Sequence, residues 1–332
     1  MLLSGTPQSV MVFPPVLWHY LTVDGEEGHI SAIASYLKDE ADSTLLGTVF
    51  PGLLNTDVAA TRVGAVPLGV EQILLEQPDL VLSWSWLADE LAQIRYPGLV
   101  WMEGDDTAGM ETTYRLFGSL SGRSEAADRL LAHHARAMDE LGRSVSPAPR
   151  PIKVAVMPNS EFVLRIKGAD ILQTLGWLGA SDVGADLPPR NSPINVETLF
   201  VFDPDFIFLP SYIGNTRLAP ADLYADPRLE AISAIRQRRV YRMPGGVARM
   251  GGPVEAPLLA QWMVELINPE ARLRQPLRTA IREAYRTAFD YEASDDAIDG
   301  MLRIDDNRAS AGYRRFARDG APDVPAPGIP PT

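Results

Sequence analysis

The chain has 332 residues, 46% of them hydrophobic, and a formal net charge of -13. This length allows two ordinary domains or one large one, and the composition is that of a folded globular protein. The acidic charge, with no basic block, argues against a nucleic-acid partner. The absence of cysteine excludes disulfides, thiolate metal sites, iron–sulfur clusters and cysteine nucleophiles.

The N-terminal residues, MLLSGTPQSVMVFPPV, lack the basic start and the continuous apolar stretch of a signal peptide. No segment of the sequence approaches the 18 apolar residues of a membrane span. The residues alone therefore predict either a cytosolic protein or the mature form of an exported one.

The first third of the chain alternates apolar runs with stretches of helical spacing. We expect buried strands at residues 10–13, 45–49, 80–83 and 99–102. Helical spacing is found at residues 30–37 and 87–94. This alternation predicts a mainly parallel sheet that is covered on both faces.

A helix is predicted at residues 124–141, and the alternation then resumes with strands at 154–157, 180–183, 206–209 and 240–242. We therefore expect four regions. They are an N-terminal α/β lobe at 1–120, a bridging helix at 121–147, a C-terminal α/β lobe at 148–308 and a Pro-rich tail at 309–332.

One short unit occurs twice, and it is the most specific signal in the sequence. A Val-Glu pair is followed seven residues after the Glu by Pro-Asp and an apolar strand. The second copy begins 126 residues after the first without a gap; the two copies contain Val70, Glu71, Pro78 and Asp79, then Val196, Glu197, Pro204 and Asp205. The repeat predicts two lobes of similar construction, in which Pro-Asp and the strand belong to the scaffold.

Common catalytic motifs are missing from the sequence. It has no phosphate-binding loop, no Gly-x-Gly-x-x-Gly turn and no Gly-x-Ser-x-Gly nucleophile elbow. Its four histidines form no His-x-x-x-His or Glu-x-x-His pair for zinc. We therefore predict a binding protein and not an enzyme, with no catalytic residue, no metal site and no cofactor.

Aromatic and polar residues follow the predicted strands. Ligands of open α/β sheets bind at the carboxyl ends of strands, and tryptophan stacks well on conjugated surfaces. An arginine after the last strand could meet an anionic group of the ligand. The candidate ligand-binding residues are Pro15, Trp18, Phe50, Trp84, Trp86, Trp101, Asn159, Tyr212 and Arg249.

The repeated unit, together with Asp-Pro-Arg-Leu at 226–229, resembles the substrate-binding proteins of ABC importers for iron–siderophore complexes, haem and cobalamin. The similarity extends from residue 10 to about residue 288. It implies an α/β fold of two Rossmann-like lobes with mainly parallel sheets, bridged by a single long α-helix, with the ligand cleft between the lobes.

The resemblance also implies partners and a location. Glu71 and Glu197 match the glutamates that meet arginines of the membrane permease in this family. We accordingly expect a monomeric periplasmic protein, present here in its mature form without the signal peptide. Its ligand would be a small molecule, namely an iron chelate, haem or a corrinoid, and its partner an ABC permease.

Two other functions remain open at this point. One is a two-lobed enzyme such as a nucleotide-sugar glycosyltransferase, with Glu103 or Asp105 as its base. The other is a metal-ion binder or haem-handling protein with His19 or Tyr20 as a ligand. Metal-ion binding usually requires three or four converging His and carboxylate side chains, which this sequence does not supply.

Overall fold

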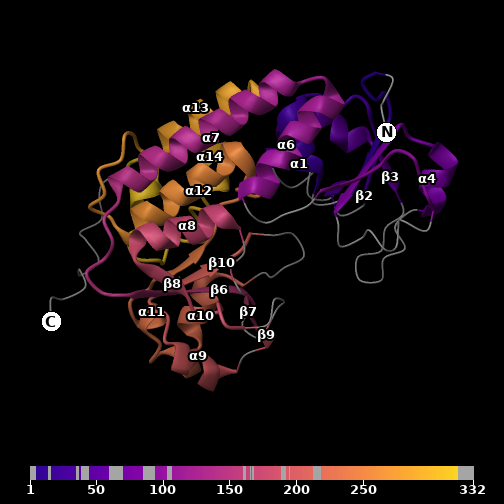
Figure 1. Cartoon of the computed structure of the whole chain (residues 1–332). Helices are drawn as coiled ribbons and strands as arrows, with labels where there is room; N and C mark the ends of the chain where they lie inside the picture. The colour runs from indigo at the N-terminus through magenta and orange to yellow at the C-terminus, as the bar shows by residue number, and fades with distance from the viewer. Residues whose placement is uncertain are drawn as a thin grey trace.

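The protein consists of two α/β lobes joined by one long helix, α7 (Ser124–Ser144), as Figure 1 shows. None of the helices in the described ranges has the length and apolar content needed to span a membrane. The computed structural model describes residues 5–13, 16–34, 37–38, 45–59, 70–84, 94–102, 107–159, 162–164, 166, 168–187, 192–193, 195–211 and 218–320.

The N-terminal lobe is built on a parallel sheet with the strand order β3-β2-β1-β4-β5 in the described residues. Its central strand pairs with neighbours on both sides. The strands are β1 (Val10–Val12), β2 (Ile30–Ala34), β3 (Asp57–Ala59), β4 (Leu80–Trp84) and β5 (Leu99–Met102). The helices are α1 (Val16–Asp24), α3 (Leu45–Val49), α4 (Val70–Glu76) and α6 (Thr107–Ser121), with a 3-10 helix, η1 (Pro51–Asn55).

Alternate residues of β1 face two different helical layers. Val10 and Val12 belong to a core that includes residues of α1 and α6. Met11 and Phe13 belong to a second core with Ile73 of α4. Because both faces are covered, the strand is apolar at every position, as is typical of a parallel sheet.

Two predicted elements of this lobe are wrong. Residues 30–34 form strand β2 instead of a helix, and residues 45–49 form helix α3 instead of a strand. Short apolar runs do not distinguish a strand covered on both faces from a buried helix, which explains both errors. The strands predicted at 10–13, 80–83 and 99–102 are confirmed. The helix predicted at 87–94 lies outside the described residues, except for a turn at Ile94.

Helix α7 confirms the predicted bridging helix and extends it to Ser144. Its buried face is formed by Ala127, Leu131, His134 and Met138, which follow one another at spacings of three and four residues. Along this face it packs on α6 of the N-terminal lobe and on two helices of the C-terminal lobe, α8 and α12. The helix therefore contacts both lobes along its length instead of spanning a gap between them.

The sheet of the C-terminal lobe has the order β11-β10-β6-β7-β9 in the described residues, with β8 also paired to β6. It is parallel at β8, β6, β10 and β11 and antiparallel at β7 and β9. The strands predicted at 154–157, 180–183, 206–209 and 240–242 are confirmed. The bounds are β6 (Ile152–Asn159), β7 (Phe162–Leu164), β8 (Ala180–Asp182), β9 (Ser192–Pro193), β10 (Phe206–Leu209) and β11 (Val240–Arg242).

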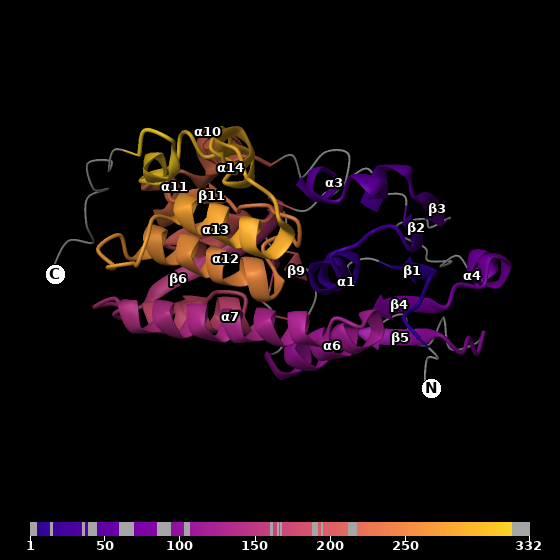
Figure 2. The same cartoon turned by 90° about the horizontal axis from the view of Figure 1, so that it is seen from above.

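The helices of this lobe lie on both sides of the sheet. Phe206 and Phe208 of β10 face the core that includes α8 and α12, whereas Ile207 faces α9, α10 and α11. Figure 2 shows α12 between α7 and α13. The bounds are α8 (Ala169–Leu178), α9 (Val196–Phe202), α10 (Pro220–Ala225), η3 (Pro227–Leu229), α11 (Ser233–Arg236), α12 (Gly252–Ile267), α13 (Leu277–Phe289), α14 (Asp295–Met301) and η4 (Tyr313–Phe316).

The chain stays packed beyond Arg308, where the Pro-rich tail was expected to begin. Tyr313 and Phe316 are buried, and the indole Nε1–H of Trp262 donates to the Tyr313 hydroxyl at 3.0 Å. Residues 309–320 are therefore part of the C-terminal lobe, and residues 321–332 of the expected tail lie outside the described residues.

The Pro-Asp part of the repeated unit performs the same task in both lobes. The carboxylate of Asp79 accepts the backbone N–H of Ser9, at the start of β1, at 3.2 Å. The carboxylate of Asp205 accepts the backbone N–H of Lys153, at the start of β6, at 2.9 Å. Each aspartate thus fastens the first residues of the central strand to the strand beside it.

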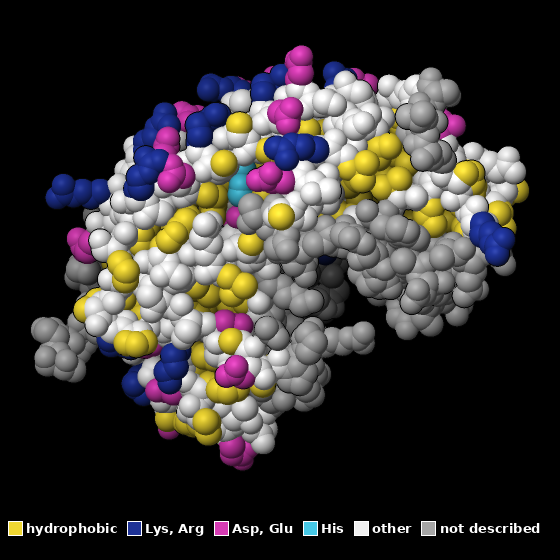
Figure 3. Space-filling model, in the orientation of Figure 1, with side chains coloured by type: hydrophobic (Ala, Val, Ile, Leu, Met, Phe, Trp, Pro, Cys, Tyr) yellow, Lys and Arg dark blue, Asp and Glu magenta, His cyan; other side chains and the backbone are white. Residues whose placement is uncertain are grey.

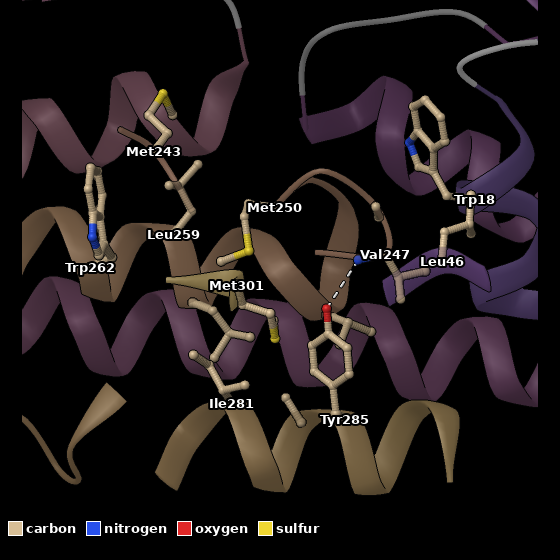
Figure 4. Packing of buried hydrophobic residues seen from close by; sticks show 14 of the residues in the cluster. Trp18, Leu46, Met243, Val247, Met250, Leu259, Trp262, Ile281, Tyr285 and Met301 are labelled. Atoms are coloured by element: carbon tan, nitrogen blue, oxygen red, sulfur yellow. Dashed lines mark hydrogen bonds between the residues drawn. The ribbon is translucent and has the colours of Figure 1, made fainter. Parts of the chain in front are cut away.

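One apolar core extends through both lobes. Trp18 and Leu46 contribute to it from the N-terminal lobe, and Met250, Trp262 and Tyr285 contribute from the C-terminal lobe (Figure 4). Burial of such large side chains stabilises the contact by about 1.5–3 kcal/mol each relative to exposure. The lobes are therefore held together by apolar packing as well as by α7.

Candidate functional site

Segments that follow the carboxyl ends of two strands, one in each lobe, meet at the junction of the lobes. In the N-terminal lobe the carboxyl end of β1 leads into α1, and in the C-terminal lobe the carboxyl end of β11 leads through residues 243–251 into α12. This is the position in which open α/β sheets hold ligands.

Two of the predicted ligand-binding residues contact each other here. The guanidinium carbon of Arg249, from the C-terminal lobe, lies 4.4 Å from the ring centroid of Trp18, from the N-terminal lobe. This is a cation–π contact, and such contacts contribute about 0.5–2 kcal/mol depending on desolvation. Trp18 is buried, and the guanidinium of Arg249 lies over its ring.

The loop that carries Arg249 is organised by a buried glutamate. The Glu255 carboxylate accepts backbone N–H groups from Val247 at 2.8 Å, Ala248 at 2.8 Å and Met250 at 2.9 Å, and it also accepts the Tyr285 hydroxyl. Figure 4 shows Tyr285 pointing from α13 toward this loop, where its oxygen also accepts the N–H of Val247 at 3.1 Å. Burial raises the pKa of Glu255, and these donors oppose the rise.

The backbone of this loop is held in an uncommon conformation. Arg249 and Met250 have φ values of 52° and 61°, in the left-handed region. For residues other than glycine this region is sparsely populated and is maintained by surrounding contacts. A Cβ added at Gly246 would lie 2.1 Å from the Glu255 carboxylate, so only glycine fits there. The direction of Arg249 is therefore set by the fold.

A second contact between the lobes lies beside the first. His19 Nδ1 and the Tyr114 hydroxyl are hydrogen-bonded at 2.9 Å in the N-terminal lobe. A Cβ added at Gly252 of the C-terminal lobe would lie 2.3 Å from the Tyr114 hydroxyl, which shows how closely α12 approaches. Burial lowers the pKa of His19 to about 4 and raises that of Tyr114, so both are neutral at pH 7.

The other predicted ligand-binding residues are placed as follows. Phe50 is buried, and its ring meets that of Phe289 of the C-terminal lobe edge to face, with centroids 6.1 Å apart. The backbones of three others belong to β4, β5 and β6, but their side chains are outside the described part of the structure: Trp84, Trp101 and Asn159. Three more lie outside the described residues altogether: Pro15, Trp86 and Tyr212.

Sequence reasoning did not find several residues of this junction. Glu255 had a signal, because it lies in the first turn of a helix that starts at Gly-Gly-Pro, where acidic residues are favoured. Tyr285 and Phe289 had none, since they come from α13, more than 30 residues beyond the loop, where Tyr285 contacts Val247 and Phe289 contacts Phe50. Only the folded chain brings them to the junction.

The residues named in the metal-binding alternative make protein contacts. The Tyr20 hydroxyl lies 3.2 Å from His29 Nε2, and Tyr20 is buried. His19 is bonded to Tyr114, as described above. Within the described ranges, no group of three or more His, Asp or Glu residues is arranged to hold a metal ion.

The two predicted docking glutamates lie far from this junction. Glu71 and Glu197 are each the second residue of a short helix, α4 and α9. Figure 1 places these helices at the outer ends of the two lobes, away from α7. Glu197 is exposed, whereas the side chain of Glu71 is outside the described part.

Comparisons with known proteins agree with this architecture. A family model described as periplasmic binding protein matches residues 55–246. Comparison of the chain with curated proteins found no match. A periplasmic solute-binding protein from Veillonella parvula has a similar structure, with a TM-score of 0.77, 23% sequence identity and coverage of 91% of this chain and 94% of that one.

Two further solved structures are similar at lower identity. CeuE from Helicobacter pylori in its Ni-His complex has a TM-score of 0.72 and 16% identity, covering 90% of this chain and 95% of that one. MolA from Haemophilus influenzae bound to molybdate has a TM-score of 0.70 and 13% identity, covering 87% and 96%. These structures share the fold, while the family model covers more than half of the chain. The protein therefore belongs to the periplasmic binding proteins, which are the solute-binding components of ABC importers.

Proposed function

We propose that the protein captures an iron chelate such as a ferric siderophore, haem or a corrinoid between its lobes and delivers it to a membrane permease. The observation that carries this proposal is the contact of Arg249 with Trp18. It joins a cation from one lobe to a conjugated ring from the other, at the strand ends where this fold holds ligands.

A ligand that replaces this contact needs two properties. It needs a flat or conjugated face to cover the indole of Trp18, and an anionic group to pair with Arg249. Metal chelates with carboxylate or other anionic arms have both. The Ni-His complex in CeuE and the molybdate in MolA support a ligand of this general kind, because they are a metal complex and an oxyanion in the same fold.

Capture requires no change of a bond in the ligand. Micromolar affinity corresponds to about 8 kcal/mol, which one or two charge-assisted hydrogen bonds and burial of an aromatic face can supply. We propose that the protein acts as a monomer in the periplasm. We also propose that Glu71 and Glu197 meet basic residues of the permease, since one lies at the outer end of each lobe.

Ligand binding is tested with the purified protein. Tryptophan fluorescence and native mass spectrometry are recorded against ferric siderophores, haem and cobalamin, with molybdate and Ni-histidine as further probes. At least one chelate should quench the fluorescence and bind with one ligand per monomer. Binding of none of the chelates would contradict the proposed ligand class.

The role of Arg249 is tested with Arg249→Gln. Loss of one charge-assisted hydrogen bond should weaken binding of the same chelate about 10- to 100-fold. The control is Arg129→Gln, which removes an exposed arginine of α7 that is paired only weakly with Glu125, at 3.7 Å. Equal affinities for both variants would show that the ligand is held elsewhere.

A further inference from the structure

Four large apolar side chains are exposed at the outer ends of the two lobes. On α4, Leu74 is 52% exposed and Leu75 79% exposed. On α9, Phe200 is 40% exposed and Val201 80% exposed. We call these the tip pairs. Single exposed apolar residues are common, but adjacent pairs on two separate helices need a reason.

The tip pairs occupy equivalent places in the two copies of the repeated unit. Phe200 and Val201 each lie 126 residues after Leu74 and Leu75, the same separation as that of the two glutamates. The exposure of both pairs is thus a property of the unit itself. It occurs once on each lobe.

The local structure around the tip pairs is also the same. The residue before each pair, Ile73 or Leu199, is buried and anchors its helix to the sheet. Each helix ends at a left-handed residue, Gln77 or Asp203, whose N–H donates at 2.9 Å to the carbonyl of that anchor. One packing arrangement therefore turns both tip pairs outward.

The charge around the tip pairs limits the partner. Neither α4 nor α9 contains a Lys or Arg, and each carries a glutamate in its first turn. The one described basic group bonded to the end of α9 is the ammonium of Lys153, which donates to the Phe202 carbonyl at 2.6 Å. The whole chain has a net charge of -13. A second copy of the chain or an anionic lipid surface would bring like charges together, whereas a partner with apolar sockets beside basic residues is complementary.

From this arrangement we propose that the tip pairs are the apolar anchors by which the protein docks on its permease, one pair on each of two equivalent halves. The inference rests on the proposed delivery to a permease and adds contacts to those of the two glutamates. Figure 1 shows α4 and α9 at the ends of different lobes, and Figure 3 shows hydrophobic side chains over both regions. Simultaneous engagement of both pairs then makes docking bivalent, so its strength depends on the angle between the lobes.

Site-specific crosslinking in the native cell tests the partner without any ligand. The photo-reactive amino acid p-benzoylphenylalanine replaces Leu75 or, in a separate variant, Val201. Both positions should crosslink to the same multi-spanning subunit of an ABC importer. Leu172 of α8 is the control position, because it is also about half exposed but is not at a lobe end. Adducts with a second copy of the chain, with different proteins at the two positions, or equally at position 172 would overturn the proposal.

Substitution tests the energetic role. Leu75→Ser and Val201→Ser should each lower cellular uptake of a bound chelate about fivefold, and the double variant about 25-fold, because distant sites act additively. Chelate affinity and thermal stability should stay within twofold and within about 1 °C of the wild type, since both side chains are exposed. Leu172→Ser should change nothing. Unchanged uptake in the double variant, with chelate binding intact, would refute the docking role but leave the proposed function standing.

Discussion

The two lobes are alike at their outer ends and different at their inner edges. Outside, α4 and α9 share a buried anchor, an exposed apolar pair and a left-handed end. Inside, the N-terminal lobe presents the ring of Trp18, and the C-terminal lobe presents Arg249 on a loop that Glu255 fixes. This difference fits the two proposals above, in which the outer ends meet the two halves of a permease and the inner edges hold an asymmetric ligand.

The largest effect on stability is expected from a substitution of Glu255, which fixes the loop of the C-terminal lobe. Glu255→Gln replaces one acceptor oxygen by an NH₂ group that faces backbone N–H donors in a buried site. Leaving two such donors unsatisfied costs about 1–3 kcal/mol each, so we expect a loss of about 3–5 kcal/mol in the free energy of unfolding, measured by urea denaturation. Chelate affinity should fall as well, because Arg249 loses its fixed direction.

The control for this variant is Glu283→Gln on α13. The Glu283 carboxylate is exposed and accepts one hydrogen bond, from Gln275 at 3.0 Å. Its substitution should change stability by less than about 0.5 kcal/mol. If Glu255→Gln were equally mild, the loop would be held by its other contacts.

A smaller effect is expected from the histidine at the junction. The folded protein holds the pKa of His19 at about 4, and the unfolded chain has the ordinary value of 6.5. Between these values the unfolded chain binds a proton that the folded chain does not, so stability falls as pH falls from about 6.5 to 4. At about 1.4 kcal/mol per pKa unit, wild type should lose on the order of 3 kcal/mol more than His19→Asn between pH 7 and pH 4.

Urea denaturation of both proteins at several pH values measures this difference. Other titrating groups, among them Glu255 with its raised pKa, are common to both proteins and cancel in the comparison. Identical pH profiles would show that His19 is solvated in the folded protein.

The smallest effects on stability are expected at the ends of α4 and α9, where the two copies of the repeated unit differ in their hydrogen bonds. Gln77→Gly places a glycine at a position with left-handed backbone, which glycine adopts without strain. This substitution should stabilise the protein by about 0.5 kcal/mol. Asp203→Gly relieves the same conformation but removes two hydrogen bonds, from the Ser233 N–H at 2.8 Å and its hydroxyl at 3.0 Å, and should destabilise by about 1 kcal/mol. Thermal unfolding measures both. Changes of the same sign would show that these hydrogen bonds contribute little.

Local pattern predicted much of this fold and less of the site. Strands such as β10 and β11 and the helix α7 were recognised because they are strongly patterned. The element types of β2 and α3 were predicted wrongly, because a mainly apolar run of five residues fits either a strand or a helix. The pairing of Arg249 with Trp18 depends on how the lobes meet, which no spacing in the sequence records.

The apolar core that crosses both lobes has a consequence for kinetics. A carrier whose lobes are packed together through α7 and α12 cannot open widely without exposing that core to water, so its ligand-free form stays close to the form that binds. Association should then require only a local separation of Arg249 from Trp18, and should proceed at a similar rate for related ligands. We therefore expect related ligands to differ mainly in their residence time on the protein. We also expect the permease to release the ligand by separating the two lobes.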